Sequence, residues 1–271
     1  MSRAWGTLAL LGVLSCGRGS ADGGAPVANS RAPAEKAARL KRPLAPELRE
    51  VTRAVEERRY EDGQALARRY VDAHPSDGQA NFLLGMTHYW AGNFGAARAW
   101  LERALELEPE TYVVHDPLGY ALFMLGDLGG ARREYEAFLT AEPGEPKGHY
   151  GLGLIELDET RLSEAEARFR RAIELFEALR RRDPGQVAAR LPELAECHAR
   201  LGEVHFARDE LEAARAELVR ATTICPGNIS AFYTLSVVQR RLGNGEQADQ
   251  AAQHYESARQ ALLAHQRSGR E

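Results

Sequence analysis

The residues LLGMTHYWAGNFGAA at positions 83–97 carry a pattern of small residues that decides the fold. Gly85 follows a leucine, Gly92 stands before Asn93, and Ala97 lies twelve residues after Gly85. Small residues at helical spacing let one helix approach another closely, and glycine before asparagine suits a turn because glycine tolerates positive φ. The stretch therefore predicts one helix, a tight turn and a second helix packed against the first.

The same pattern recurs along the chain at a fixed interval. The glycine, the alanine and a closing proline each return every 34 residues, as Gly85, Gly119 and Gly153; Ala97, Ala131 and Ala165; and Pro75, Pro109 and Pro143. The interval then lengthens to 49, which gives Gly202 and Ala214, and returns to 34 for Ser236 and Ala248. No single hairpin can bury its own apolar face, so the units are expected to stack.

This pattern resembles that of the tetratricopeptide repeats, which are helix–turn–helix units of 34 residues. The resemblance implies an all-α fold, a right-handed superhelical solenoid of about six units over residues 44–267. The expected units are 44–77, 78–111, 112–145, 146–194, 195–228 and 229–262.

The fourth unit is expected to contain 15 extra residues within the segment 174–194. Helix-forming residues run to about Arg182, so we predict two elongated helices that project from the solenoid. The segment is either a self-association device or a neutral insertion. Pro117 and Pro192 fall inside predicted helices, which predicts displaced helix starts at both places.

The first sixteen residues, MSRAWGTLALLGVLSC, combine Arg3 with an apolar stretch too short to span a bilayer. Residues Val13-Leu14-Ser15-Cys16 resemble a bacterial lipobox, which implies a signal peptide over 1–15 and lipidation of Cys16. The alternative is an ordinary signal peptide with an incidental cysteine.

Residues 16–43 are rich in Gly, Ala, Ser and Pro and predict a flexible tether. A coil of this length spans roughly 30 Å. Because Gly17, and not an aspartate, follows the cysteine, the resemblance implies an outer-membrane lipoprotein facing the periplasm. Without lipidation the protein would be periplasmic or secreted.

Charged side chains make up 27% of the chain and the net charge is −4. Both signs are interleaved, which argues against a nucleic-acid partner. The sequence shows no phosphate-binding loop, serine elbow or metal motif, so we expect no enzyme activity, no cofactor and no metal.

Five histidines occupy first-helix positions where the repeat needs bulk, and we predict structural roles for them: His88, His115, His149, His198 and His205. Cys197 and His198 are neighbours and cannot face the same way on a helix, which disfavours a zinc site. Cys197 and Cys225 lie at ends of one predicted hairpin that should meet. They form either a disulfide, as an oxidising compartment would allow, or buried free thiols.

The resemblance further implies a concave groove lined by recurring first-helix positions, here Phe82, Met86, Tyr89, Trp90, Tyr120, Phe123, Tyr150, Leu154, Phe206 and Tyr233. This groove lacks the Lys/Asn/Arg set with which chaperone-binding members clamp a carboxylate. Aromatic anchors suit an apolar or extended peptide. Some of these rings are equally explained as packing between repeats.

The expected function is a lipid-anchored, non-enzymatic scaffold that binds a protein or peptide of unknown identity. Two alternatives stay open. One is a factor similar to the pilotin lipoproteins of type IV pili or secretion systems, from whose regular array the 49-residue interval departs. The other is a structural protein that self-associates through the 174–194 insertion.

Overall fold

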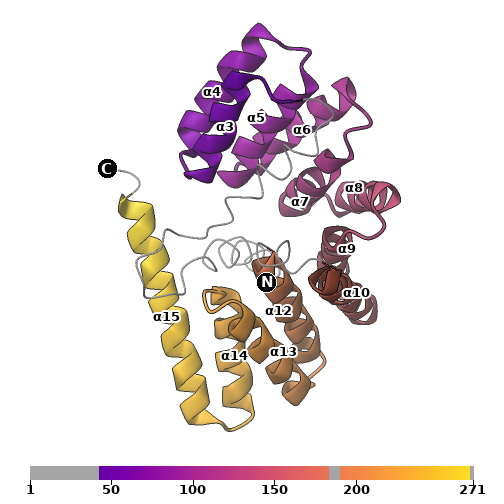
Figure 1. Ribbon diagram of the computed structural model, residues 1–271. Coiled ribbons are helices and arrows are strands. Elements are labelled where there is room, and N and C mark those ends of the chain that lie inside the picture. Colours follow the sequence, from indigo (N-terminus) through magenta and orange to yellow (C-terminus); the bar gives the residue numbers. More distant parts are fainter. Residues whose placement is uncertain (1–42, 183–189, 269–271) are drawn as a thin grey trace. The chain divides into compact units, whose positions relative to one another are not determined.

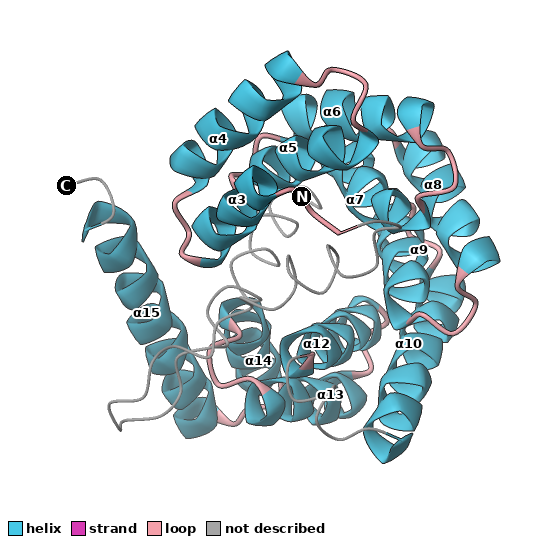
Figure 2. Cartoon of the chain, turned by 45° about the horizontal axis from the view of Figure 1, so that its top comes forward, coloured by secondary structure: helices cyan, strands magenta, loops and turns pink. Residues whose placement is uncertain are grey.

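The computed structural model describes residues 43–182 and 190–268. Within these ranges the chain forms twelve α-helices and one 3₁₀ helix, with no strand (Figure 2). The predicted all-α class is confirmed. The signal peptide, Cys16 and the tether lie outside the described residues, as does the segment 183–189.

The chain divides after Ile155 into two compact units, which are described separately. In the first unit consecutive helices pack as antiparallel hairpins, and first helices of adjacent hairpins also touch, as α3 does α5 and α5 does α7 (Figure 1). Its elements are α3 (Pro46–Glu56), α4 (Tyr60–Ala73), α5 (Gly78–Trp90), α6 (Phe94–Leu107), η2 (Tyr112–Val114), α7 (His115–Leu125), α8 (Leu128–Ala141) and most of α9 (Pro146–Asp158).

The second unit repeats this arrangement. Helix α12 contacts α10, α13 and α14, and α14 contacts α13 and α15. Its elements are the end of α9, then α10 (Leu162–Arg182), α12 (Leu191–Ala207), α13 (Leu211–Ile224), α14 (Ile229–Arg241) and α15 (Gly245–Ser268).

Six hairpin turns share one backbone geometry. In each turn one residue has a left-handed φ between 59° and 84°, and these residues are Arg58, Gly92, Gly126, Thr160, Asp209 and Gly243. The N–H of the next residue donates to the carbonyl five residues earlier at 2.8–2.9 Å in every case, which is the Schellman closure of a helix C-terminus. The turns follow the 34, 34, 34, 49, 34 spacing of the sequence repeat.

Small residues in the first helices make room for large ones in the second helices. A Cβ added to Gly85 would lie 2.8 Å from Leu101, and one added to Gly202 would lie 2.7 Å from Leu218. Tyr135 of α8 is the largest such wedge, because Cβ atoms on Gly119 and Gly151 would lie 3.1 Å and 2.1 Å from its ring. The repeating alanines are buried as well: Ala97, Ala131, Ala165, Ala214 and Ala248.

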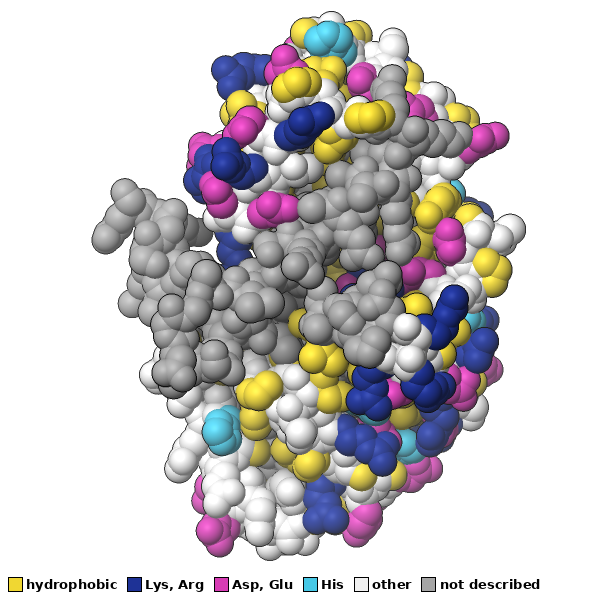
Figure 3. Space-filling view, in the orientation of Figure 1, with side chains coloured by type: hydrophobic (Ala, Val, Ile, Leu, Met, Phe, Trp, Pro, Cys, Tyr) yellow, Lys and Arg dark blue, Asp and Glu magenta, His cyan; other side chains and the backbone are white. Residues whose placement is uncertain are grey.

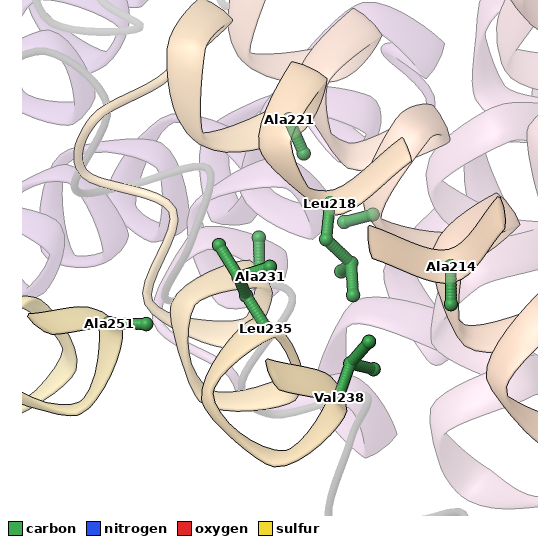
Figure 4. Close-up of a cluster of buried hydrophobic side chains, with 8 residues drawn as sticks. Ala214, Leu218, Ala221, Ala231, Leu235, Val238 and Ala251 are labelled. Atoms are coloured by element: carbon green, nitrogen blue, oxygen red, sulfur yellow. The ribbon is translucent and has the colours of Figure 1, made fainter. Parts of the chain in front are cut away.

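The core of the second unit shows how alanine permits this close packing. Ala214, Leu218 and Ala221 of α13 meet Ala231, Leu235 and Val238 of α14, and Ala251 of α15 closes the cluster (Figure 4). Small side chains bring the helix axes together, and the two leucines and the valine fill the remaining space.

The described part of the lengthened interval extends helix α10, and this extension packs against α12. Helix α10 continues to Arg182, and its buried stripe Ala165, Phe169, Ala172 and Phe176 extends with it. The guanidinium of Arg190, just before α12, lies 5.1 Å from the Phe176 ring centroid. The predicted elongation of α10 to Arg182 is present; its part around Phe176 packs against the start of α12, and Arg180, Arg181 and Arg182 at its end are exposed.

Both prolines stand in first turns, where a missing N–H costs no helical hydrogen bond. Helix α7 begins at His115, two residues before Pro117, and the 3₁₀ helix η2 precedes it. Helix α12 begins at Leu191, with Pro192 in its first turn. The predicted displacement of both helix starts is present.

The disulfide between Cys197 and Cys225 is not formed, because Cys197 is a buried free thiol. Since α12 begins at Leu191, Cys197 lies in its second turn, about 9 Å along the axis from the first residue. Cys225 caps the far end of α13, opposite the start of α12. Burial raises the pKa of the Cys197 thiol well above the usual value.

Candidate partner-binding surface

A cluster of aromatic rings joins the second and third hairpins within the first unit. The ring of Tyr89 lies 5.2 Å from that of Trp90, 6.1 Å from Phe94 and 5.7 Å from Tyr120, each in an edge-to-face arrangement. Tyr120 also approaches Phe94 at 5.9 Å and Phe123 at 6.2 Å. We call these five residues, Tyr89, Trp90, Phe94, Tyr120 and Phe123, the aromatic cluster.

The cluster forms because the repeat places the end of α5 and the start of α6 beside α7. Helix α5 ends at Trp90, and the turn at Gly92 and the side-chain cap of Asn93 on Ala96 N–H begin α6 at Phe94. Contacts of α5 and α6 with α7 then bring Tyr120 against these residues.

The predicted groove residues differ in exposure. Phe82, Met86, Tyr120 and Leu154 are buried, Phe82 to 1% and Met86 to 3% exposure. Tyr233 is exposed, and the others are half-buried: Tyr89, Trp90, Phe123, Tyr150 and Phe206. Phe82 and Met86 are thus interior side chains, while the half-buried rings combine packing with some solvent exposure.

Phe94 is a member of the cluster that the sequence analysis missed. It is the first residue of a second helix, whereas the predicted groove positions all lie on first helices. The signal was its place directly after the capping Asn93, next to the turn that follows Trp90.

The indole N–H of Trp90 is buried and has no hydrogen-bond acceptor. A buried donor without an acceptor costs about 1–3 kcal/mol. The ring sits against Tyr89, so the donor belongs to the aromatic cluster.

In the second unit the predicted residues lie in two smaller contacts. The Arg241 guanidinium lies 5.4 Å from the Phe206 ring centroid and also pairs with Asp209 at 2.5 Å. Tyr233 lies 5.4 Å from Tyr255 of α15. The first contact links neighbouring hairpins through α12 and α14, and the second joins α14 to α15 within one hairpin.

A buried ionic network runs along α12. Arg200 donates to Glu196 and to Glu203, each at 2.7 Å, and Asn228 donates to Glu196 at 3.1 Å. One carboxylate oxygen of Glu203, Oε1, is buried without a hydrogen-bond partner. Burial raises the pKa of Glu203, and the positive charge of Arg200 offsets this only in part. The Arg200 guanidinium thus pairs with two carboxyl groups, those of Glu196 and Glu203.

The histidines pack or pair inside hairpins. His115 and His198 contact carboxylates of the facing helix, and His205 contacts Glu210 at 2.6 Å. Burial, followed by the charge of Arg68, lowers the pKa of His88. In the described ranges, no three His, Cys, Asp or Glu side chains are grouped so as to hold a metal ion.

On the face shown in Figure 3, Lys and Arg side chains lie close to Asp and Glu side chains. Many are neighbours on one helix, such as Arg68 with Asp72 and Arg98 with Glu102. Of the helices in the described part of the chain, none combines the length and the apolar character needed to cross a bilayer.

These features define an all-α repeat protein whose hairpins share one turn geometry and present aromatic side chains. The family is shown by sequence: the tetratricopeptide repeat pattern matches residues 48–110, 117–167 and 166–229, more than half of the chain. The chain belongs to the tetratricopeptide repeat family, a generally non-enzymatic fold that serves protein–protein interaction. A comparison with curated protein sequences gives no match.

Solved structures with the same fold share little sequence with this chain. A chain of the APC/C hetero-tetramer Cut9–Hcn1 is 14% identical, with a TM-score of 0.68; the match covers 78% of this chain and 39% of that one. Pseudomonas aeruginosa pilF is 18% identical, with a TM-score of 0.56, over 67% of this chain and 76% of that one. MamA from Desulfovibrio magneticus RS-1 is 17% identical, with a TM-score of 0.53, over 66% and 96%. This chain thus spans about two fifths of the Cut9–Hcn1 chain and most of the two bacterial proteins.

Proposed function

We propose that this protein is an adaptor that binds an extended protein or peptide segment at the aromatic cluster. The observation that carries the proposal is the set of edge-to-face rings from Tyr89 to Phe123, in which a buried indole donor has no acceptor. Aromatic side chains supply much contact area at a low cost in conformational entropy, and Trp and Tyr are enriched among residues that dominate binding energy.

Trp90 sets the chemistry expected of the bound segment. Its ring offers an apolar contact, and its N–H calls for an oxygen acceptor, which the backbone carbonyls of an extended peptide provide at regular spacing. Binding would satisfy a donor that is unpaired in the free protein. The preferred segment therefore places an apolar side chain beside an accessible carbonyl.

The test is to select peptides from a random phage-displayed library on the full mature chain and to compare variants by titration. Trp90→Phe keeps an aromatic ring but removes the donor, so affinity should fall about tenfold. Phe123→Ala removes contact area and should weaken binding by a comparable factor or more. Tyr70→Ala is the matched control, because Tyr70 is a half-buried ring on α4 that stacks on His74, away from the cluster.

Thermal melting of the same variants separates binding from folding. Trp90→Phe should melt at or above the wild-type temperature because it removes an unsatisfied buried donor. Equal affinity of wild type, Trp90→Phe and Phe123→Ala for the selected peptides would place the binding site elsewhere.

The location belongs to the proposal as well. Lipidation of Cys16 would anchor the protein in the bacterial outer membrane, facing the periplasm, with residues 16–43 as the tether. This rests on the Val13-Leu14-Ser15-Cys16 run at the end of a short apolar stretch.

A pilotin-like role in type IV pilus or secretion-system assembly is the second candidate function. The similarity to Pseudomonas aeruginosa pilF over 67% of this chain favours it, together with the lipobox-like residues. An outer-membrane pilus protein that fails to assemble when the gene is deleted would support this role. Normal assembly would exclude it.

Self-association through residues 174–194 is a further alternative, which gel filtration tests. Phe176, the largest apolar side chain of the described part of this segment, is 1% exposed and covered by Arg190. We therefore expect a monomer. A stable dimer abolished by changes at exposed Arg181 and Arg182 would favour self-association instead.

A further inference from the structure

One acidic side chain shares a helix face with rings of the aromatic cluster. Asp116 lies in the first turn of α7, and Tyr120 and Phe123 follow it by four and seven residues. Residues at this spacing lie on one side of a helix, one turn after another. Asp116 and Phe123 are half-buried, and Tyr120 is 7% exposed. The carboxylate therefore continues the line of aromatic side chains along α7.

The hydroxyl of Tyr135 in α8 lies where this carboxylate meets tyrosines of three first helices. Burial raises the pKa of the hydroxyl well above the usual value, and the negative charge of Asp116 raises it further. Smaller contributions come from the phenols of Tyr89, Tyr120 and Tyr150. Because electrostatic interactions weaken with distance, all four groups lie near the Tyr135 hydroxyl. One carboxylate and three phenols from α5, α7 and α9 are thus gathered in the first unit.

Neighbouring rings at this place are inclined to one another. The centroids of Tyr89 and Tyr120 are 5.7 Å apart with their planes at 69°, and those of Tyr120 and Phe123 are 6.2 Å apart with their planes at 41°. The face of an aromatic ring is electron-rich and attracts cations, most strongly where water is partly excluded. A carboxylate beside such rings adds a full negative charge, so this place suits a positively charged group.

One basic side chain, Lys147, lies on the same side of α9 as Tyr150, because it precedes that residue by three positions in the first turn of the helix. Its ammonium would repel a second positive charge brought close to Tyr150. Removal of this charge is therefore expected to favour a basic group that arrives with a bound segment.

We propose that Asp116, Tyr89, Tyr120 and Tyr150 form an acidic aromatic site that receives a basic side chain, lysine or arginine, of the bound segment. The carboxylate supplies the opposite charge, the ring faces add cation–π attraction, and the phenol oxygens accept hydrogen bonds. This inference deepens the proposed function and rests on it, since it assigns a basic residue to the segment that binds at the aromatic cluster.

The first experiment changes the peptide and leaves the protein intact. Peptides selected from the random phage-displayed library on the full chain should share a lysine or arginine at a recurring position. Synthetic peptides with norleucine at that position keep an aliphatic stem but lose the charge, and they should bind the wild-type chain about tenfold more weakly. Selected peptides without a recurring basic residue, or norleucine peptides of unchanged affinity, overturn the proposal.

The second experiment changes the protein. Asp116→Asn keeps the shape of the side chain and removes its charge, so the basic peptide should bind about tenfold more weakly. Norleucine should then cost only about threefold, because the ring faces remain. Lys147→Gln should tighten binding of the basic peptide. Glu136→Gln, at an exposed position of α8, also removes one negative charge and is the matched control, with an expected change below about twofold.

Two variants at the aromatic cluster distinguish failure of this inference from failure of the proposed function. If Trp90→Phe and Phe123→Ala leave affinity unchanged, the cluster is not the binding site and the inference falls with it. If they weaken binding while Asp116→Asn binds both peptides as wild type does, the cluster binds its segment without a basic contact and only the inference is wrong. Should thermal melting show that Asp116→Asn is unfolded, the comparison of the two peptides on the wild-type chain decides.

Discussion

Tyr135 is tightly enclosed by neighbouring helices of the first unit. Its ring fills the space between α7 and α9 that Gly119 and Gly151 leave open, and it is 1% exposed. Burial, followed by the negative charge of Asp116, raises the pKa of its hydroxyl well above the usual value. Because the ring is large and fully buried, it has no space to move when a neighbouring residue is replaced by a larger one.

Gly151→Ala should therefore be strongly destabilising. The added Cβ would lie 2.1 Å from the Tyr135 ring, and overpacking of this kind lowers the free energy of unfolding by about 3 kcal/mol. Gly95→Ala is the control, because a Cβ there meets nothing within 4 Å and should add about 0.5 kcal/mol of stability. Urea unfolding of both variants makes the comparison. Equal free energies of unfolding for Gly151→Ala and Gly95→Ala would contradict the tight packing of Tyr135 against Gly151.

Glu203 should make the protein less stable at neutral pH than a neutral side chain would. Its pKa is raised in the folded state, mainly by burial, so the folded protein binds more protons than the unfolded chain between the usual glutamate value of 4.5 and the folded value. The stabilising contribution of the protonated carboxyl is complete at low pH and is lost as the pH rises through the folded pKa.

Glu203→Gln should accordingly raise the melting temperature at pH 7, and this gain should vanish as the pH falls to 4. Glu136→Gln, at an exposed position of α8, should change the melting temperature little at either pH. A lower melting temperature of Glu203→Gln at pH 7 would show that the bond to Arg200 outweighs the cost of burial.

At the scale of the helix, the elongation of α10 is part of the core. The stripe of Ala165, Phe169, Ala172 and Phe176 follows helical spacing beyond the length that a regular repeat needs. Contact with the start of α12 buries its last member. The additional turns thus lengthen the interface between these two helices.

Phe176→Ala tests this interpretation. Removal of a fully buried ring should cost about 3 kcal/mol in the free energy of unfolding. Glu174→Ala on the same helix, whose side chain is 64% exposed, should change stability by less than about 0.5 kcal/mol. A small loss in the free energy of unfolding of Phe176→Ala would instead show that the extension of α10 is not part of the core.

The sequence predicted the elements better than it predicted their side-chain environments. Two turns are predicted by their own residues, Gly92 with Asn93 and Gly126 with Asp127. In each turn the glycine adopts a positive φ and the following side chain caps the next helix. Arg58, Thr160 and Asp209 take the same left-handed conformation without a glycine, and only the 34-residue register reveals them. Local chemistry and periodicity together were sufficient for the fold.

The sequence did not predict which side chains are buried or which of them form hydrogen bonds with one another. Phe82 and Tyr89 both occupy expected groove positions, yet one is interior and the other half-buried, because exposure depends on the neighbouring hairpin. The bond from His198 to Glu217 joins residues of two helices whose relative rotation the sequence does not specify. Of the two alternatives left open for Cys197, a disulfide with Cys225 or a buried free thiol, the structure has the buried free thiol.

For the whole molecule, the location can be tested without knowledge of a partner. If Cys16 is lipidated, a labelled fatty acid should enter the protein in cells, and Cys16→Ser should abolish the label and release the protein from membranes. Cys197→Ser is the matched control and should keep the label. An unlabelled wild-type protein would leave a soluble periplasmic or secreted form.

The nearest-neighbour contacts of the helices also bear on how the chain folds. Among the described helices, those with extensive contacts are adjacent or next to adjacent in sequence, so these contacts close only loops of one or two helices. Such a topology has low contact order, which favours fast folding. Stability then approximates a sum over hairpins and their junctions, as in a one-dimensional chain of coupled spins, and folding can begin at any hairpin and spread in both directions.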